Sequence, residues 1–102
     1  MEKDSKNNLS KKEDWPKTYE EAVYNIINKL NDDTKAEILE TKYEKLIGFN
    51  RLWGMGIRNN FGLWRGNHEL MQSCMKLRDI DSYDPDIVSL IIIEEVWKKL
   101  KG

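Results

Sequence analysis

The sequence contains one cysteine, one histidine and two prolines among its 102 residues. Cys74 has no second cysteine with which to form an internal disulfide. We therefore expect a reducing compartment and interpret the chain as a cytoplasmic protein of a bacterium or of something that infects one. His68 and Cys74 cannot supply the four ligands of a structural zinc site, and Gln72 stands where the pattern H-E-x-x-H would need its second histidine. We predict no metal site, no cofactor and no recognisable set of catalytic residues.

Long apolar runs are also missing. The longest, residues 87–93, is interrupted by Ser89 and is far shorter than the ~20 residues of a membrane-spanning helix. No apolar stretch follows the first lysines, so we expect no secretory signal. Charged residues make up 34% of the chain but sum to a net charge of −1. That balance gives no bulk attraction to nucleic acid or to an anionic membrane, so we expect no membrane partner and disfavour a nucleic-acid partner.

Large aromatic residues are plentiful in most of the chain but absent from its beginning. Four Trp, four Tyr and two Phe suit the compact core that a domain of this size needs. Residues 1–14 have only Met1 and Leu9 as apolar side chains, and their four lysines are balanced by four acids. Such a segment cannot bury enough surface to offset its ordering entropy. The sequence predicts a disordered tail over residues 1–14 and a single helical domain over residues 15–102.

Helical periodicity runs through that domain. Thr18 and Glu21 have the spacing of a capping box, and apolar residues follow them at i, i+3, i+4 and i+7 positions. Asp84 and Pro85 give a second start signal, because proline is favoured in the first helical turn. Residues 87–93 are apolar nearly all round, which predicts that the last helix is the central one. The expected helices cover residues 19–31, 34–42, 44–59, 68–77 and 85–101, so the fold class is all-α, a compact bundle of about five helices.

Positive charge is concentrated in the middle of the chain. Residues 46–78 hold five cationic side chains against one acid, a net charge of +4, whereas residues 15–45 sum to −2 and residues 79–102 to −3. All four arginines, the histidine and five of the six glycines lie in this middle segment. The asymmetry favours a binding site there, but pairing of the arginines with the acidic flanks would explain it without a ligand.

The expected helix 44–59 has two distinct sides. Its apolar face carries Leu46, Phe49, Leu52 and Trp53. Arg51, Met55 and Arg58 share another side, because residues three, four and seven apart lie over one another. Guanidinium groups match carboxylates and phosphates, so that side could receive an anionic or planar group. The alternative partners for these arginines are acids of the same chain, for example Glu44, Asp79, Asp81 or Asp84.

Two polar triplets flank a glycine-containing link. Arg58-Asn59-Asn60 ends one expected helix and Asn67-His68-Glu69 begins the next. Brought together, they offer groups for polar recognition and for acid–base chemistry, or they form a buried hydrogen-bond network that locks the turn. Trp64, beside Arg65, is either a core residue or an exposed stacking platform. The predicted ligand-binding residues are Arg51, Arg58, Asn59, Asn60, Trp64, Arg65, Asn67 and His68.

Three strings of the sequence resemble a family of small bacterial domains of unknown function. They are WPKTYEEAV, IGFNRLWGMGIRNNFGLWRGN and IIIEEVWKKL, and the resemblance covers about residues 15–101. That family has a W-P-x-T-x-x-E-A opening and an I-R-N-x-F-G-L-W-x-x-N core. The matching positions are Trp15, Pro16, Thr18, Glu21, Ala22, Ile57, Arg58, Asn59, Phe61, Gly62, Leu63, Trp64 and Asn67. Asn50 stands where members often carry histidine, so the resemblance implies no obligatory catalytic base at that position.

These observations leave three functions open. The first is a non-enzymatic binding or accessory module whose 50–69 surface engages an anionic or planar ligand or a protein partner. The second is a small hydrolase or transferase that uses Arg58, Asn59, His68 and Glu69. The third is a helical structural protein that forms a homodimer.

Overall fold

A computed structural model describes residues 12–102 of the chain. Residues 1–11 of the predicted tail lie outside the described residues. The described part of that tail, Lys12–Asp14, forms the short 3-10 helix η2, and the backbone N–H of Trp15 donates to the carbonyl of Lys12 at 3.2 Å. An ordered turn therefore leads directly into the helical domain.

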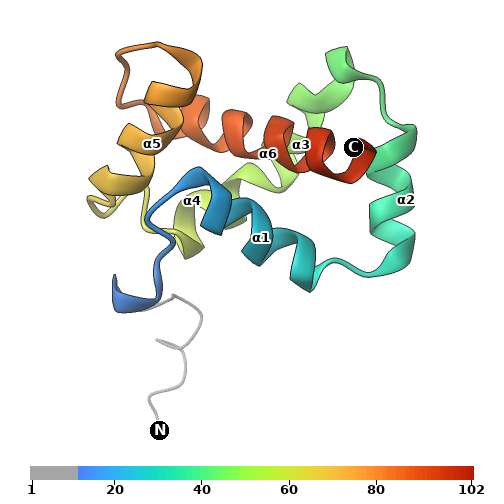
Figure 1. Ribbon diagram of the computed structural model, residues 1–102, viewed down its shortest axis with the longest axis horizontal. Helices are drawn as coiled ribbons and strands as arrows, with labels where there is room; N and C mark the ends of the chain where they lie inside the picture. Colours follow the sequence, from blue (N-terminus) through green and yellow to red (C-terminus); the bar gives the residue numbers. More distant parts are fainter. Residues whose placement is uncertain (1–11) are drawn as a thin grey trace, which may run out of the picture.

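Six α-helices and no strand make up the regular structure of residues 12–102, together with two 3-10 helices (Figure 1). The all-α prediction is confirmed, while the expected number of about five helices is one too low. The α-helices are α1 (Tyr19–Lys29), α2 (Asp32–Glu40), α3 (Leu46–Leu52), α4 (Gly54–Asn60), α5 (His68–Arg78) and α6 (Pro85–Lys101), and η3 (Tyr43–Lys45) precedes α3.

The additional helix arises because the expected helix 44–59 is interrupted at Trp53. Trp53 still has α-helical dihedrals, and its N–H donates to the carbonyl of Phe49 at 2.7 Å. Gly54 and Gly56 follow it closely, and glycine costs a helix interior about 1 kcal/mol relative to alanine. Both α3 and α4 contact α6. The interruption lets two short helices lie against the same central helix.

Side-chain caps fix where the longer helices begin. Thr18 Oγ1 accepts from the N–H of Glu21 at 3.2 Å, as the capping box predicts. Asp84 caps α6 with Pro85 at its first position. Asn31 rather than one of the following aspartates caps α2, since its Oδ1 accepts from Thr34 N–H at 2.8 Å.

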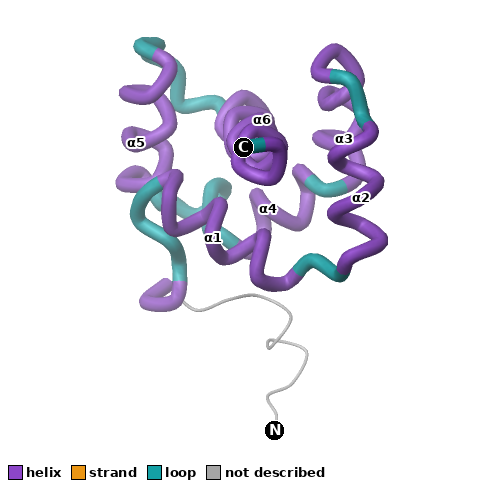
Figure 2. Tube along the Cα trace, turned by 45° about the vertical axis from the view of Figure 1, so that its right-hand side comes forward, coloured by secondary structure: helices purple, strands orange, loops and turns teal. Residues whose placement is uncertain are grey.

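The last helix, α6, is the centre of the bundle, as its apolar sequence predicted. It contacts all five other α-helices, and Figure 2 shows it nearly end-on between α5 on one side and α2 and α3 on the other. Its buried residues are Val88, Ser89, Ile91, Ile92, Ile93 and Val96. No helix among residues 12–102 is long and apolar enough to span a membrane.

Candidate functional site

Arg58, the central residue of the predicted site, is turned into the bundle. Its Nη1 donates to Ser89 Oγ at 3.0 Å and lies 3.0 Å from Asp86 Oδ1, and its side chain is only 11% exposed. Ser89 is fully buried, and both partners lie in the first turns of α6. Arg58 therefore joins α4 to α6 through groups of the same chain.

Asn50 on α3 completes this polar network. Ser89 Oγ donates to Asn50 Oδ1 at 2.6 Å, and Asn50 Nδ2 donates to the carbonyl of Asp86 at 3.2 Å. A Cβ atom at Gly54 would collide with the side chains of Asn50 and Arg58. Close packing within the chain, rather than a ligand against the backbone, thus accounts for a glycine at position 54.

Asn67 is also engaged in internal bonds. It is 4% exposed, and its Nδ2 donates to the carbonyls of Pro16 at 2.9 Å and Phe61 at 2.7 Å. Its Oδ1 accepts from the N–H of Leu70 at 3.3 Å and so caps α5. Both amide donors are used, and this one side chain ties the α4–α5 turn to the start of the domain. The geometry is that of the buried network weighed from the sequence.

The same turn is built around Trp15, which is 6% exposed. Gly62 has φ +72°, and a Cβ atom there would collide with the Trp15 ring. The Arg65 guanidinium covers the ring at 4.9 Å from its centroid, and Arg65 Nη2 donates to the carbonyl of Asn59 at 2.9 Å. Part of the binding capacity of Arg65 is therefore used to hold this turn.

The remaining predicted site residues lie on the outside of the molecule. Trp64 is 60% exposed, so it is not a core residue, and Leu52, assigned to the apolar face of the expected helix, is 76% exposed. Met55 is 59% exposed. We call the following exposed residues the 50–69 surface: Arg51, Leu52, Met55, Asn59, Asn60, Trp64, Arg65 and His68.

The residues of the predicted enzyme alternative have separate partners within the chain. His68 meets the ring of Tyr83 edge-on at 5.7 Å between centroids, while Glu69 pairs with Lys17 at 3.4 Å. Within residues 12–102, no hydrogen bond or ion pair joins the side chains of Arg58, Asn59, His68 and Glu69 to one another.

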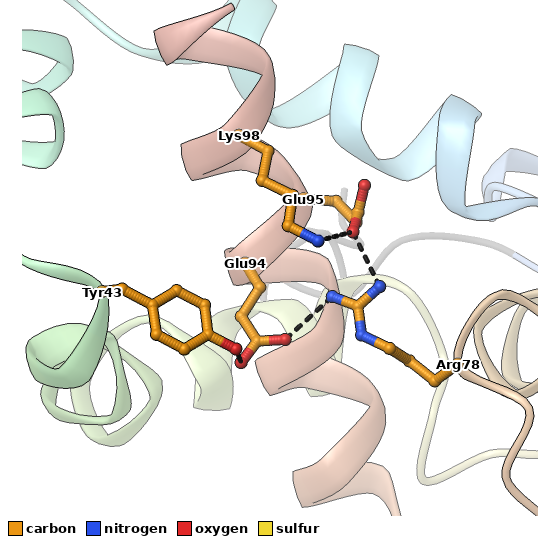
Figure 3. Close-up of polar contacts among 5 residues, drawn as sticks. All are labelled: Tyr43, Arg78, Glu94, Glu95 and Lys98. Atoms are coloured by element: carbon orange, nitrogen blue, oxygen red, sulfur yellow. Dashed lines mark hydrogen bonds and ion pairs between the residues drawn. The ribbon is translucent and has the colours of Figure 1, made fainter.

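A second charged cluster, which the sequence did not reveal, joins α5 and η3 to α6. Arg78 donates from Nη2 to Glu94 and from Nη1 to Glu95, both at 2.8 Å. Figure 3 shows that Tyr43 reaches Glu94 from the side opposite Arg78 and that Lys98 reaches Glu95. The Tyr43 hydroxyl donates to Glu94 at 3.0 Å, and Lys98 Nζ lies 3.3 Å from Glu95. Arg58 and Arg78 thus both pair with acids of residues 79–102, and Arg58 does so through Asp86 rather than through the acids named as examples. The sequence features that could have predicted this cluster are the arginine in the last turn of α5 and the two adjacent glutamates on the central helix.

Burial and these contacts shift the pKa of several groups. Burial raises the pKa of the Cys74 thiol from 9.0 to about 12, which makes the thiol a poor nucleophile. The hydrogen bond to Glu94 raises the pKa of Tyr43. Burial lowers the pKa of Arg78, but its hydrogen bonds to Glu94 and Glu95 outweigh that effect and raise it. Each of the three shifts favours the protonated form of its group.

Comparison with known proteins gives one positive result. A family model described as a domain of unknown function (DUF6794) matches residues 15–100. The predicted resemblance to a family of domains of unknown function is confirmed at that level. Neither the curated proteins nor the solved structures gave a match. No group of three or more His, Cys, Asp and Glu side chains in residues 12–102 could hold a metal ion.

Proposed function

The chain belongs to the DUF6794 family of domains of unknown function, and we propose that it is a non-enzymatic module that binds a protein partner through the 50–69 surface. A cytoplasmic location in a bacterium is part of this proposal, and the unpaired thiol of Cys74 supports it.

The observation that carries the proposal is the exposure of three large apolar side chains between residues 50 and 69. Leu52, Met55 and Trp64 are each more than half exposed. Interfaces are enriched in tryptophan, methionine and arginine, and tryptophan and arginine dominate the residues that carry binding energy. Arg51 is exposed in the same segment and adds donors for a partner's polar groups.

A small anionic ligand is supported less well by the geometry. Of the polar residues expected to hold it, Arg58 and Asn67 have donors bonded within the chain. Freeing either of them would break contacts between segments and leave buried polar groups without partners. The remaining exposed groups suit a broad protein surface better than a pocket.

Site-specific photo-crosslinking in the host cell tests this proposal. A photoreactive amino acid replaces Trp64 in one variant and Leu52 in another, and Glu37 on the exposed side of α2 in a matched control. We expect a discrete adduct of the same partner from positions 52 and 64 and none from position 37. The absence of an adduct at both test positions, or the same adducts from the control, would contradict the proposal.

A thermal-shift screen against nucleotides and anionic metabolites distinguishes a small-ligand site from a protein-binding surface. We expect no stabilisation, because a ligand raises the unfolding temperature only when it binds the native state. A stabilising anion whose effect disappears in Arg51→Ala would show that the 50–69 surface serves a small ligand instead.

A further inference from the structure

An open groove of about 810 Å³ lies between α1 and the C-terminal half of α6. Its apolar lining comes from Val23, Tyr24, Ile27 and Leu100. The Tyr24 side chain is 70% exposed, so a large aromatic ring at the groove is left without cover by the chain itself. None of the groove residues belongs to the 50–69 surface, so a function of this groove would be separate from the one proposed above.

The two walls of the groove carry opposite charges. The α1 wall has Glu20 and Glu21, and the α6 wall has Lys98, Lys99 and one acid, Glu95, which is paired with Arg78 and Lys98. The Glu21 carboxylate accepts from the Lys17 N–H at 2.8 Å, and Lys98 pairs with Glu95.

Two charges on this rim are left for an incoming surface. Glu20 and Lys99 are exposed, and within residues 12–102 the side chain of neither forms a hydrogen bond or an ion pair. The groove thus offers one acidic and one basic position on opposite walls, with an apolar floor between them.

We propose that this groove is the interface of a symmetric dimer of the chain. A twofold axis between the two walls lays α1 of each copy over α6 of the other. That operation brings Glu20 of one copy toward Lys99 of its partner, twice per dimer, and places each Tyr24 ring over the partner's apolar floor.

Charge complementarity is the reason to choose a second copy as the occupant. A twofold contact joins the same patch on both chains, so the patch must complement itself. A groove with one acidic and one basic wall meets this condition, because the symmetry exchanges the walls. Opposite charges in register suppress other pairings, since like charges brought together oppose association.

Sedimentation velocity on the full chain and two charge-reversal variants tests the interface. At high protein concentration, the unaltered chain should sediment as a species with twice the 12.1 kDa mass of one chain. Glu20→Lys and Lys99→Glu each create two repulsive contacts per dimer, and each should raise the dimer dissociation constant at least about tenfold.

Mixing the two variants gives the decisive measurement. The Glu20→Lys chain is basic at both rim positions and the Lys99→Glu chain is acidic at both. Both contacts of the mixed dimer are therefore attractive again, and a dimer should reappear. Matched controls reverse exposed charges elsewhere, Glu37→Lys on α2 and Lys42→Glu before η3, and should leave dimerisation unchanged. Far-UV circular dichroism establishes that every variant is folded.

Two results would overturn the inference. A monomer at all concentrations would exclude a second copy as the occupant of the groove. A dimer that ignores both charge reversals, or that the mixture fails to restore, would place the contact elsewhere on the molecule.

Discussion

At the scale of single residues, two of the side chains that look like ligand-binding groups in the sequence are held by groups of the same chain. Arg58 and Asn67 each connect segments far apart in the chain. Removing a polar residue of this kind is strongly destabilising, because its buried partners lose their hydrogen bonds without regaining water.

Asn67→Ala is therefore expected to destabilise the chain by about 2–4 kcal/mol, since it removes the cap of α5 and leaves the carbonyls of Pro16 and Phe61 without this donor. Asn59→Ala is the matched control. Asn59 is exposed, its side chain forms no hydrogen bond within residues 12–102, and its replacement should cost less than about 0.5 kcal/mol. Urea unfolding followed by tryptophan fluorescence measures both. Equal effects of the two substitutions would refute the structural role of Asn67.

At the scale of elements, sequence signals located helix starts well and the interruption at Trp53 poorly. A capping residue bonds to a backbone N–H within three residues of itself. The starts of α1 and α6 could therefore be predicted from short segments around Thr18 and Asp84. The interruption depends on how α3 and α4 meet α6, and no short window of sequence contains that information. Leu52 precedes the interruption, in the same helix as the buried Leu46, and helical periodicity places the two side chains on different sides of α3.

The two glycines of α4 should respond to alanine in opposite ways. Gly56 has open space around its Cβ position, so Gly56→Ala should stabilise the chain by up to about 1 kcal/mol through helix propensity. Gly54→Ala should destabilise it, because the new methyl group displaces the Asn50 and Arg58 side chains from their network on α6. Chemical denaturation of both variants gives the comparison. A stabilising Gly54→Ala would mean that the network tolerates the methyl group and that Gly54 is not required by packing.

At the scale of the whole molecule, the sequence predicted the class of the fold, and long-range charge pairing was the part it left open. The apolar run 87–93 identified the central helix, because only a helix surrounded by others can be apolar all round. The pairing of Arg78 with Glu94 and Glu95 links positions 16 and 17 residues apart. The sequence contains several acids that could pair with Arg78. The packing of α5 on α6 determines that Arg78 pairs with Glu94 and Glu95.

The raised pKa values of buried and hydrogen-bonded groups also make the stability of the whole molecule depend on pH. Burial raises the pKa of Cys74 from 9.0 to about 12, and the hydrogen bond to Glu94 raises the pKa of Tyr43 above 10.0. A raised native pKa means that the unfolded chain loses these protons first as the pH increases. The stabilisation is complete below about pH 9 and is lost as the pH rises toward the native values, so the free energy of unfolding should fall in alkaline solution.

Cys74→Ala isolates the largest of these contributions. The variant should be less stable than the unaltered chain near neutral pH, because a small cavity replaces the buried thiol. The stability difference between the two chains should then shrink between about pH 8 and about pH 11, since only the unaltered chain loses the contribution of the thiol. Urea unfolding midpoints under reducing conditions across that range measure the difference. A difference that stays constant with pH would show that the Cys74 thiol titrates alike in the folded and unfolded chain.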